Sequence, residues 1–239
     1  MAGQMLGWRT VCAVEWNSYA ASVLVARQNE RLLEPFPIWD DVSTFEGTRW
    51  RGIVDVVSGG FPCQDLSIAK QGGDGLDGER SGLWREMGRI IGEVRPRYVF
   101  VENSPMLVNN GLDRVLGDLS KLGFDARWGV MGADSVGAPH RRERLWLVAN
   151  SRSIGLHDRK AERDRVSQQK IYKDEPDKWD RVWSKACGCF SLDDYKSLAS
   201  EFLGMDDGVS NRVDRLKACG NAQVPECATF AWRTLIGRS

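Results

Sequence analysis

The chain has 239 residues and a mass of 26.8 kDa, with 42% hydrophobic and 28% charged residues. This length and composition indicate a globular protein with one sizeable core and room for a small appended domain. No apolar run reaches the ~18 residues that a membrane span needs, and no secretory signal opens the chain. Six cysteines are too sparse for a disulfide scaffold, so we expect a cytoplasmic protein without a membrane partner.

The charge distribution contains one basic cluster. The formal net charge is zero, but residues 141–170 carry nine Lys/Arg against four Asp/Glu. Such a cluster is either a solvated face or a patch for nucleic acid, and charge alone does not separate the two.

The first part of the chain alternates apolar runs with helical stripes. Apolar residues at helical spacing predict two core-facing helices, one over 83–94 and one over 112–122. The strand-helix alternation predicts an α/β fold with a doubly wound parallel sheet. The predicted strands cover residues 10–16, 53–57, 98–101 and 145–148.

The later part of the chain is less regular. Residues 151–205 are polar and charged, as in a small module or a long insertion. Regular structure is expected to return in residues 206–239, with a helix from Pro225 through Leu235.

Cys63 lies in the stretch GGFPCQDLS, residues 59–67, just beyond the predicted strand 53–57. A structural cysteine more often lies inside an apolar run, whereas ligands of open α/β sheets lie beyond the carboxyl ends of strands. We expect Gly59 and Gly60 to let the chain turn sharply and Pro62 to stiffen the approach to the thiol. The position indicates a nucleophile. The GxGxxG pattern at 73–78 does not open a helix after a strand, so we interpret it as a loop beside Cys63 rather than a dinucleotide site.

Four stretches in order resemble the cytosine-C5 DNA methyltransferases, especially the short enzymes of phages and prophages. They are GGFPCQDLS (59–67), VENSP (101–105), GAPHRRERLW (137–146) and GNAQVP (220–225). The resemblance implies a Rossmann-like sheet that binds S-adenosyl-L-methionine and acts on a cytosine flipped out of DNA. Residues 1–150 would form the catalytic domain, 151–205 a short target-recognition region, and 206–239 a segment returning to the catalytic domain.

The resemblance assigns the chemistry to four residues. Cys63 would add to C6 of cytosine, and Glu102 would hold N3 and the exocyclic amine and donate a proton. Arg144 would bind the cytosine O2, and Arg142 would position the backbone. The alternatives are a buried inert cysteine, a helix-capping glutamate and two arginines on a solvated strand face.

Further contacts follow from the same resemblance. Gln64 and Ser67 would contact DNA near the flipped base, and the loop at 72–82 would close over it. Glu15 would accept from the ribose hydroxyls and Trp16 would stack on adenine, unless Trp16 is an ordinary core residue. The cofactor would also contact Asp41, Val42, Pro62, Leu83, Asn221 and Ala222.

The sequence also departs from the family pattern. Relatives begin with a strand and a glycine-rich F-x-G-x-G turn, whereas the opening MAGQMLGWRTV resembles the tail of the helix after that turn. We therefore expect the first strand to be missing, which would leave unpaired sheet edges. The explanations left open are a truncation, a second chain that supplies the piece, and a degenerate relative.

The sequence thus predicts an enzyme that methylates cytosine C5 in double-stranded DNA in a prokaryotic or phage-infected cell. A cognate restriction endonuclease is a further possible partner. The alternatives are a catalytically silent DNA-binding remnant and a tRNA cytosine-C5 methyltransferase. Zinc is not expected, because Cys187, Cys189, Cys219 and Cys227 do not have the spacing of a zinc knuckle.

Overall fold

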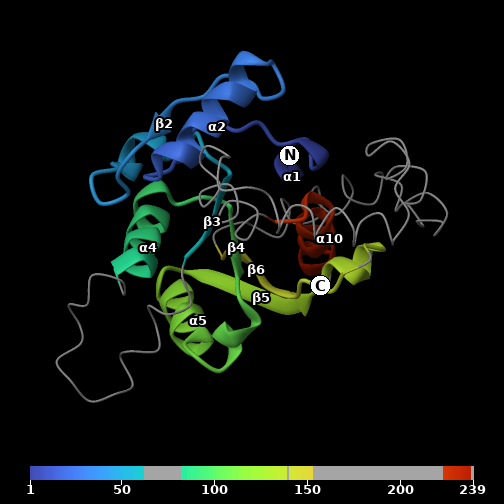
Figure 1. The fold of residues 1–239 in the computed structure, drawn as a ribbon. Coiled ribbons are helices and arrows are strands. Elements are labelled where there is room, and N and C mark those ends of the chain that lie inside the picture. Colours follow the sequence, from blue (N-terminus) through green and yellow to red (C-terminus); the bar gives the residue numbers. More distant parts are fainter. Residues whose placement is uncertain (62–81, 139, 153–222, 238–239) are drawn as a thin grey trace.

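The computed structural model describes residues 1–61, 82–138, 140–152 and 223–237 (Figure 1). Its strands are β1 (Ala13–Val14), β2 (Ile38–Trp39), β3 (Val56–Gly60), β4 (Tyr98–Asn103), β5 (Phe124–Met131) and β6 (Arg144–Ser151). Its helices are α1 (Ala2–Met5), α2 (Ser18–Asn29), α4 (Gly82–Val94), α5 (Leu112–Lys121) and α10 (Pro225–Ile236), with 3-10 turns η1 (Gly47–Trp50), η3 (Pro105–Val108) and η4 (Ala133–Val136).

The larger sheet is mixed and has the strand order β3-β4-β6-β5. β3 and β4 are parallel, whereas β6 runs antiparallel to both β4 and β5. The prediction of a wholly parallel sheet is therefore wrong for this edge. The physical reason is the connection from β5 to β6: it contains only the short turn η4 and no crossover helix, so the chain returns in the opposite direction.

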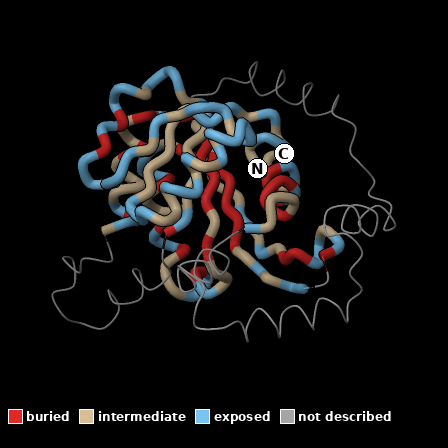
Figure 2. The backbone as a smooth tube through the Cα atoms, turned by 45° about the horizontal axis from the view of Figure 1, so that its top comes forward, coloured by how far each residue is buried: buried red, intermediate tan, exposed pale blue. Residues whose placement is uncertain are grey.

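Helices cover both faces of this sheet. The odd-numbered residues Val99 and Val101 of β4 pack with buried residues of α4 and α5. The even-numbered Tyr98 and Phe100 pack with Trp146 of β6 and with α10 on the opposite face. Figure 2 shows buried residues concentrated in the central strands, as expected for a sheet enclosed between two layers of helices.

The smaller sheet consists of β1 and β2 in parallel. It packs near α4 through a third apolar cluster around Phe45. Val14 of β1 and Val57 of β3 both pack against this cluster. Within the described residues, β1 pairs only with β2, and β3 pairs only with β4, so each has one edge without a strand partner. α2 has no buried residue, although its sequence is rich in apolar side chains.

The three predicted helices are confirmed as α4, α5 and α10. The predicted strand 53–57 is shifted to β3, because Ile53 lies in an exposed turn. β2, β5 and α2 were not predicted. Among the described residues, no helix is both long and apolar enough to cross a membrane. The domain boundaries at 150 and 205 stay a prediction, since residues 153–222 lie outside the described part of the chain.

Candidate active site

Glu102 lies near the carboxyl end of β4, on the face of the sheet that α10 covers. Its strand neighbours alternate, so Glu102 follows the even-numbered Tyr98 and Phe100 toward that face. Trp146 of β6 stands opposite Glu102 in the antiparallel register. Glu102 is therefore inside the strand rather than at its end, but still at the edge where a ligand would bind.

The Glu102 carboxylate is shared by two donors from distant segments. Oε1 is 2.9 Å from Nε of Arg144, the first residue of β6, and the two side chains are only 15% and 27% exposed. Oε2 accepts a hydrogen bond of 3.3 Å from Nε2 of Gln223, just before α10. The alternative of a helix cap does not apply, because Ser104 rather than Glu102 caps η3.

Burial raises the pKa of Glu102 above its ordinary value. The positive charges of Arg144 and Arg142 and the hydrogen bond from Gln223 act in the opposite direction. A carboxyl group with a raised pKa retains a proton nearer neutral pH, which is the property that a general acid requires.

Arg142 lies before β6, and its positive charge acts on the Glu102 carboxylate. β6 begins at Arg144, and Arg142 has a φ of 39°, so it does not belong to the strand and strand alternation does not orient it. The carbonyl of the preceding Arg141 accepts a 2.5 Å hydrogen bond from the Ala133 amide, which holds this segment against η4. His140 is exposed, as expected for a loop residue.

Gly59 and Gly60 belong to β3 and pair with Val101 and Glu102. The expectation that they turn the chain sharply out of the strand is therefore wrong. Gly60 instead lies close beside Glu102. A Cβ on Gly60 would lie 3.1 Å from Oε2 of Glu102 and 3.2 Å from the Glu102 carbonyl oxygen. The absence of a side chain leaves room for the carboxylate.

Asn103 anchors the backbone that leads to Cys63, and sequence reasoning missed it. Its side chain is 3% exposed, and Nδ2 donates a 2.7 Å hydrogen bond to the carbonyl of Phe61. Oδ1 accepts from the Ser104 amide. The position in the VENSP motif, next to Glu102, was the available signal. The predicted residues Pro62, Cys63, Gln64, Ser67, Asn221 and Ala222 lie outside the described residues.

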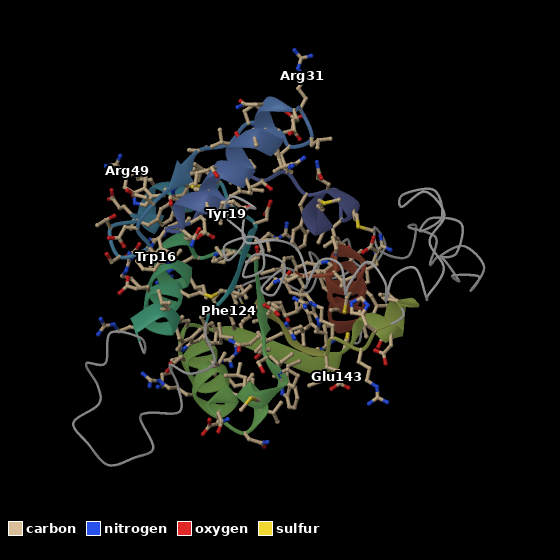
Figure 3. All side chains as sticks on the ribbon, viewed as in Figure 1. Trp16, Tyr19, Arg31, Arg49, Phe124 and Glu143 are labelled. Carbon is tan, nitrogen blue, oxygen red and sulfur yellow. The ribbon has the colours of Figure 1, made fainter. Side chains whose placement is uncertain are left out.

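The predicted cofactor residues follow two neighbouring parallel strands. Glu15 comes directly after β1, its amide donates to the Trp39 carbonyl of β2, and its Oε1 accepts a 2.8 Å hydrogen bond from the Asn17 amide. Trp16, labelled in Figure 3, is 85% exposed. The alternative of a core tryptophan is therefore wrong, and the ring is accessible for stacking.

Asp41 follows β2 and keeps its charge through local hydrogen bonds. Its Oδ1 accepts from both the hydroxyl and the amide of Ser43, and these bonds lower the pKa of Asp41. An ionised carboxylate can accept from an amino group. Val42 is half-buried against the cluster around Phe45, while Leu83 is exposed in the first turn of α4.

Arg89 of α4 fixes the loop that carries Asp41 and Val42, and it was also missed. Its guanidinium donates to the carbonyls of Val42 at 2.8 Å and Phe45 at 2.9 Å. It also pairs with Glu86 and Glu93 along the helix. The i, i+3 and i, i+4 spacing of these charges was the available signal.

Three of the four cysteines considered as zinc ligands, Cys187, Cys189 and Cys219, lie outside the described residues. Cys227 is buried in α10, and its thiol donates to the Gly132 carbonyl. The described part of the chain contains no group of three or more potential metal ligands.

Comparison with known proteins identifies similar sequences and folds. The family model of the C-5 cytosine-specific DNA methylases matches residues 2–196. Type II methyltransferase M.CviJI of Paramecium bursaria Chlorella virus IL3A is 34% identical over 113 residues, which cover 47% of this chain and 30% of that protein. Type II methyltransferase M.Eco47II of Escherichia coli is 33% identical over 154 residues, which cover 60% and 34%.

A solved structure shares the fold. The S. pombe Dnmt2 methyltransferase superposes with a TM-score of 0.52 at 16% identity, covering 73% of this chain and 52% of that one. The described part of this chain thus has the α/β fold of that methyltransferase. The matched part of this chain spans about a third of the length of the two curated relatives.

Proposed function

Because the chain belongs to the C-5 cytosine-specific DNA methylase family, we propose that it methylates C5 of a flipped cytosine in double-stranded DNA. The observation that carries this proposal is the Glu102 site. A partly buried carboxylate with a raised pKa is held between Arg144 and Gln223, beside the backbone that leads to Cys63. This combination suits a base that must be held and protonated at a ring nitrogen.

The proposed reaction begins at Cys63. Its thiolate adds to C6 and forms a C–S bond, and the electrons of the C5–C6 double bond move onto the ring as Glu102 gives a proton to N3. C5 then takes the methyl group from the sulfonium sulfur of the donor, whose S–CH3 bond breaks to leave a neutral thioether. Return of the N3 proton to Glu102, loss of the C5 proton to a base and expulsion of the Cys63 thiolate restore the double bond and release the enzyme. Arg144 would bind O2, while Arg142 would position the backbone.

S-adenosyl-L-methionine would supply the methyl group as an electrophile. The residues after β1 and β2 fit it: Glu15 and Asp41 offer carboxylates, and the exposed ring of Trp16 can stack on adenine. Val42, Pro62, Leu83, Asn221 and Ala222 would complete the contacts. Gln64 and Ser67 would contact DNA, and residues 151–205 would read its sequence.

Within the described residues, β1 and β3 each have one edge without a strand partner, and these edges support a further partner. A strand supplied by another chain could pair there and carry a glycine-rich turn. A cognate restriction endonuclease would act on the same DNA without needing to contact this chain. A DNA substrate would place the reaction in the cytoplasm of a prokaryotic or phage-infected cell.

Transfer of labelled methyl groups to duplex DNA tests the proposal. We expect the wild type to label DNA and Cys63→Ser to lose the label. Cys12→Ser is the matched control, because this partly buried thiol hydrogen-bonds the neighbouring Ala13 carbonyl, packs against the cluster around Phe45 and has no proposed part in the reaction. Equal labelling by wild type and Cys63→Ser would refute the proposed nucleophile.

Two other outcomes would favour the alternatives. Absence of cofactor binding by calorimetry, with DNA affinity that falls steeply with salt, would indicate a silent DNA-binding remnant. Labelling of tRNA instead of duplex DNA would indicate a tRNA cytosine-C5 methyltransferase.

A further inference from the structure

Gln223 links α10 to the carboxylate of Glu102 across 121 positions of sequence. It belongs to the GNAQVP stretch, in which the family resemblance implies roles only for Asn221 and Ala222. Its Nε2 donates to Oε2 of Glu102, on the opposite side of the carboxylate from the Arg144 contact to Oε1. The two oxygens thus have different donors, one from the segment just before α10 and one from β6.

The position of Gln223 is determined by the packing of α10. Val224 is the N-cap of this helix and Pro225 begins it, so Gln223 lies one residue before the N-cap. The helix is fixed to the sheet by Trp232, whose ring meets Phe100 edge to face with centroids 5.4 Å apart. Phe100 and Glu102 are on the same face of β4, so the contact that anchors the helix and the contact to the carboxylate lie on one surface.

We propose that Gln223 is a positioning residue for Glu102, whose amide holds Oε2 and fixes the orientation of the carboxyl group while Arg144 holds Oε1. This inference rests on the proposed function of Glu102 as the group that binds the cytosine. A carboxylate offers about four lone-pair sites, so these two donors leave sites for the N–H groups of a bound base. Without Gln223, Oε2 loses its donor and the carboxyl can rotate about its last bond.

The charged and polar groups around Glu102 predict how the loss of Gln223 would change the pKa of Glu102. Among the described residues, the groups that face it are Arg144 in β6, Arg142 before β6, the Cys227 thiol of α10 and Gln223 itself, while Gly60 of β3 contributes no side chain. The Gln223 amide favours the ionised form and so lowers the pKa that burial raises. Its removal is therefore expected to raise the pKa of Glu102 further.

Titration of the Glu102 carboxyl by carbon-13 NMR in the full chain tests the contact between Gln223 and Glu102. The Glu102 resonance is assigned as the one that disappears in Glu102→Gln. We expect the midpoint to rise in Gln223→Leu, which removes the donor, and to rise further in Gln223→Glu, which adds a like charge. Gln223→Asn, shorter by one methylene, should give a smaller rise. The matched control is Gln4→Leu, which makes the same change at an exposed amide that donates to the Leu32 carbonyl.

The methyl-transfer assay adds the catalytic readout. We expect Gln223→Leu to lower kcat by about threefold to tenfold, the effect of one typical hydrogen bond, with little change in KM for DNA. A midpoint unchanged in both Gln223→Leu and Gln223→Glu would overturn the proposal and leave Gln223 a structural role only. If the wild type transfers no methyl group, the proposed function fails, and the titration still decides whether Gln223 holds Glu102.

Discussion

Gly60 of β3 faces Glu102 of β4 in the parallel register, and a Cβ on Gly60 would lie 3.1 Å from Oε2 of that carboxylate. Gly60→Ala should therefore displace the carboxyl group, because the Glu102 carbonyl, at 3.2 Å, belongs to the backbone of a paired strand and cannot move freely. We expect about a tenfold loss of methyl transfer, since small displacements of reacting groups have large effects on rate.

The neighbouring glycine provides the control for this prediction. A Cβ on Gly59 would meet only the end of the Met87 side chain, at 3.4 Å from Cε, and that side chain can adjust. Gly59→Ala should retain most of the activity. Equal losses of methyl transfer in Gly59→Ala and Gly60→Ala would show that β3 tolerates no added side chain at either position. The space beside the Glu102 carboxylate would then not explain the effect.

Asn103→Ala should destabilise the protein and slow methyl transfer. The substitution leaves the Phe61 carbonyl without its 2.7 Å donor in a buried site, which costs about 1–3 kcal/mol. It also frees the backbone two residues before Cys63. Urea unfolding and the methyl-transfer rate measure the two effects, and Asn109→Ala, at an exposed position, is the control. A stable variant with normal activity would contradict the anchoring role.

Arg89→Ala should weaken the binding of S-adenosyl-L-methionine although Arg89 is not proposed to touch it. The variant loses the hydrogen bonds to the Val42 and Phe45 carbonyls, which hold the loop carrying Asp41. The expected destabilisation is about 1–3 kcal/mol. Arg85→Ala removes an arginine that is 69% exposed on the same helix and should change stability by less than about 0.5 kcal/mol. Calorimetry would reject the prediction if both variants bound the cofactor equally.

Trp16→Ala should reduce cofactor affinity without changing stability. The ring is 85% exposed, so its removal leaves no cavity, whereas the loss of stacking is expected to weaken binding about fivefold to tenfold. Trp16→Phe retains an aromatic face and should lie between wild type and Trp16→Ala. A loss of stability comparable to that of a core substitution would indicate that Trp16 packs in the protein instead.

Glu102→Gln should alter the dependence of stability on pH. Burial raises the folded-state pKa of Glu102, so its protonation stabilises the folded protein. This contribution is fully present below the unfolded pKa and is lost as pH rises through the folded pKa. Because glutamine does not titrate, the free energy of unfolding of the wild type relative to Glu102→Gln should fall as pH rises across that window.

A series of urea denaturations at different pH values measures this difference. Glu143→Gln, which removes an exposed carboxylate from the adjacent loop, is the control (Figure 3). A difference that rose with pH would show that the ion pair with Arg144 outweighs burial.

The sequence by itself determined the helices α4, α5 and α10, because each has apolar residues at helical spacing and a clear start or stop signal. Four motifs in order also identified the family. Periodicity could not locate β5 or orient β6, because strand direction depends on the connection between strands rather than on their own residues.

Only the tertiary structure decided which side chains meet. Glu102, Arg144 and Gln223 come from three distant segments, and their contact depends on the strand register and on the docking of α10. The role of Gly60 likewise appears only when β3 lies beside β4. Local patterns record which face of an element is apolar, but contacts between elements depend on the packing of the whole sheet.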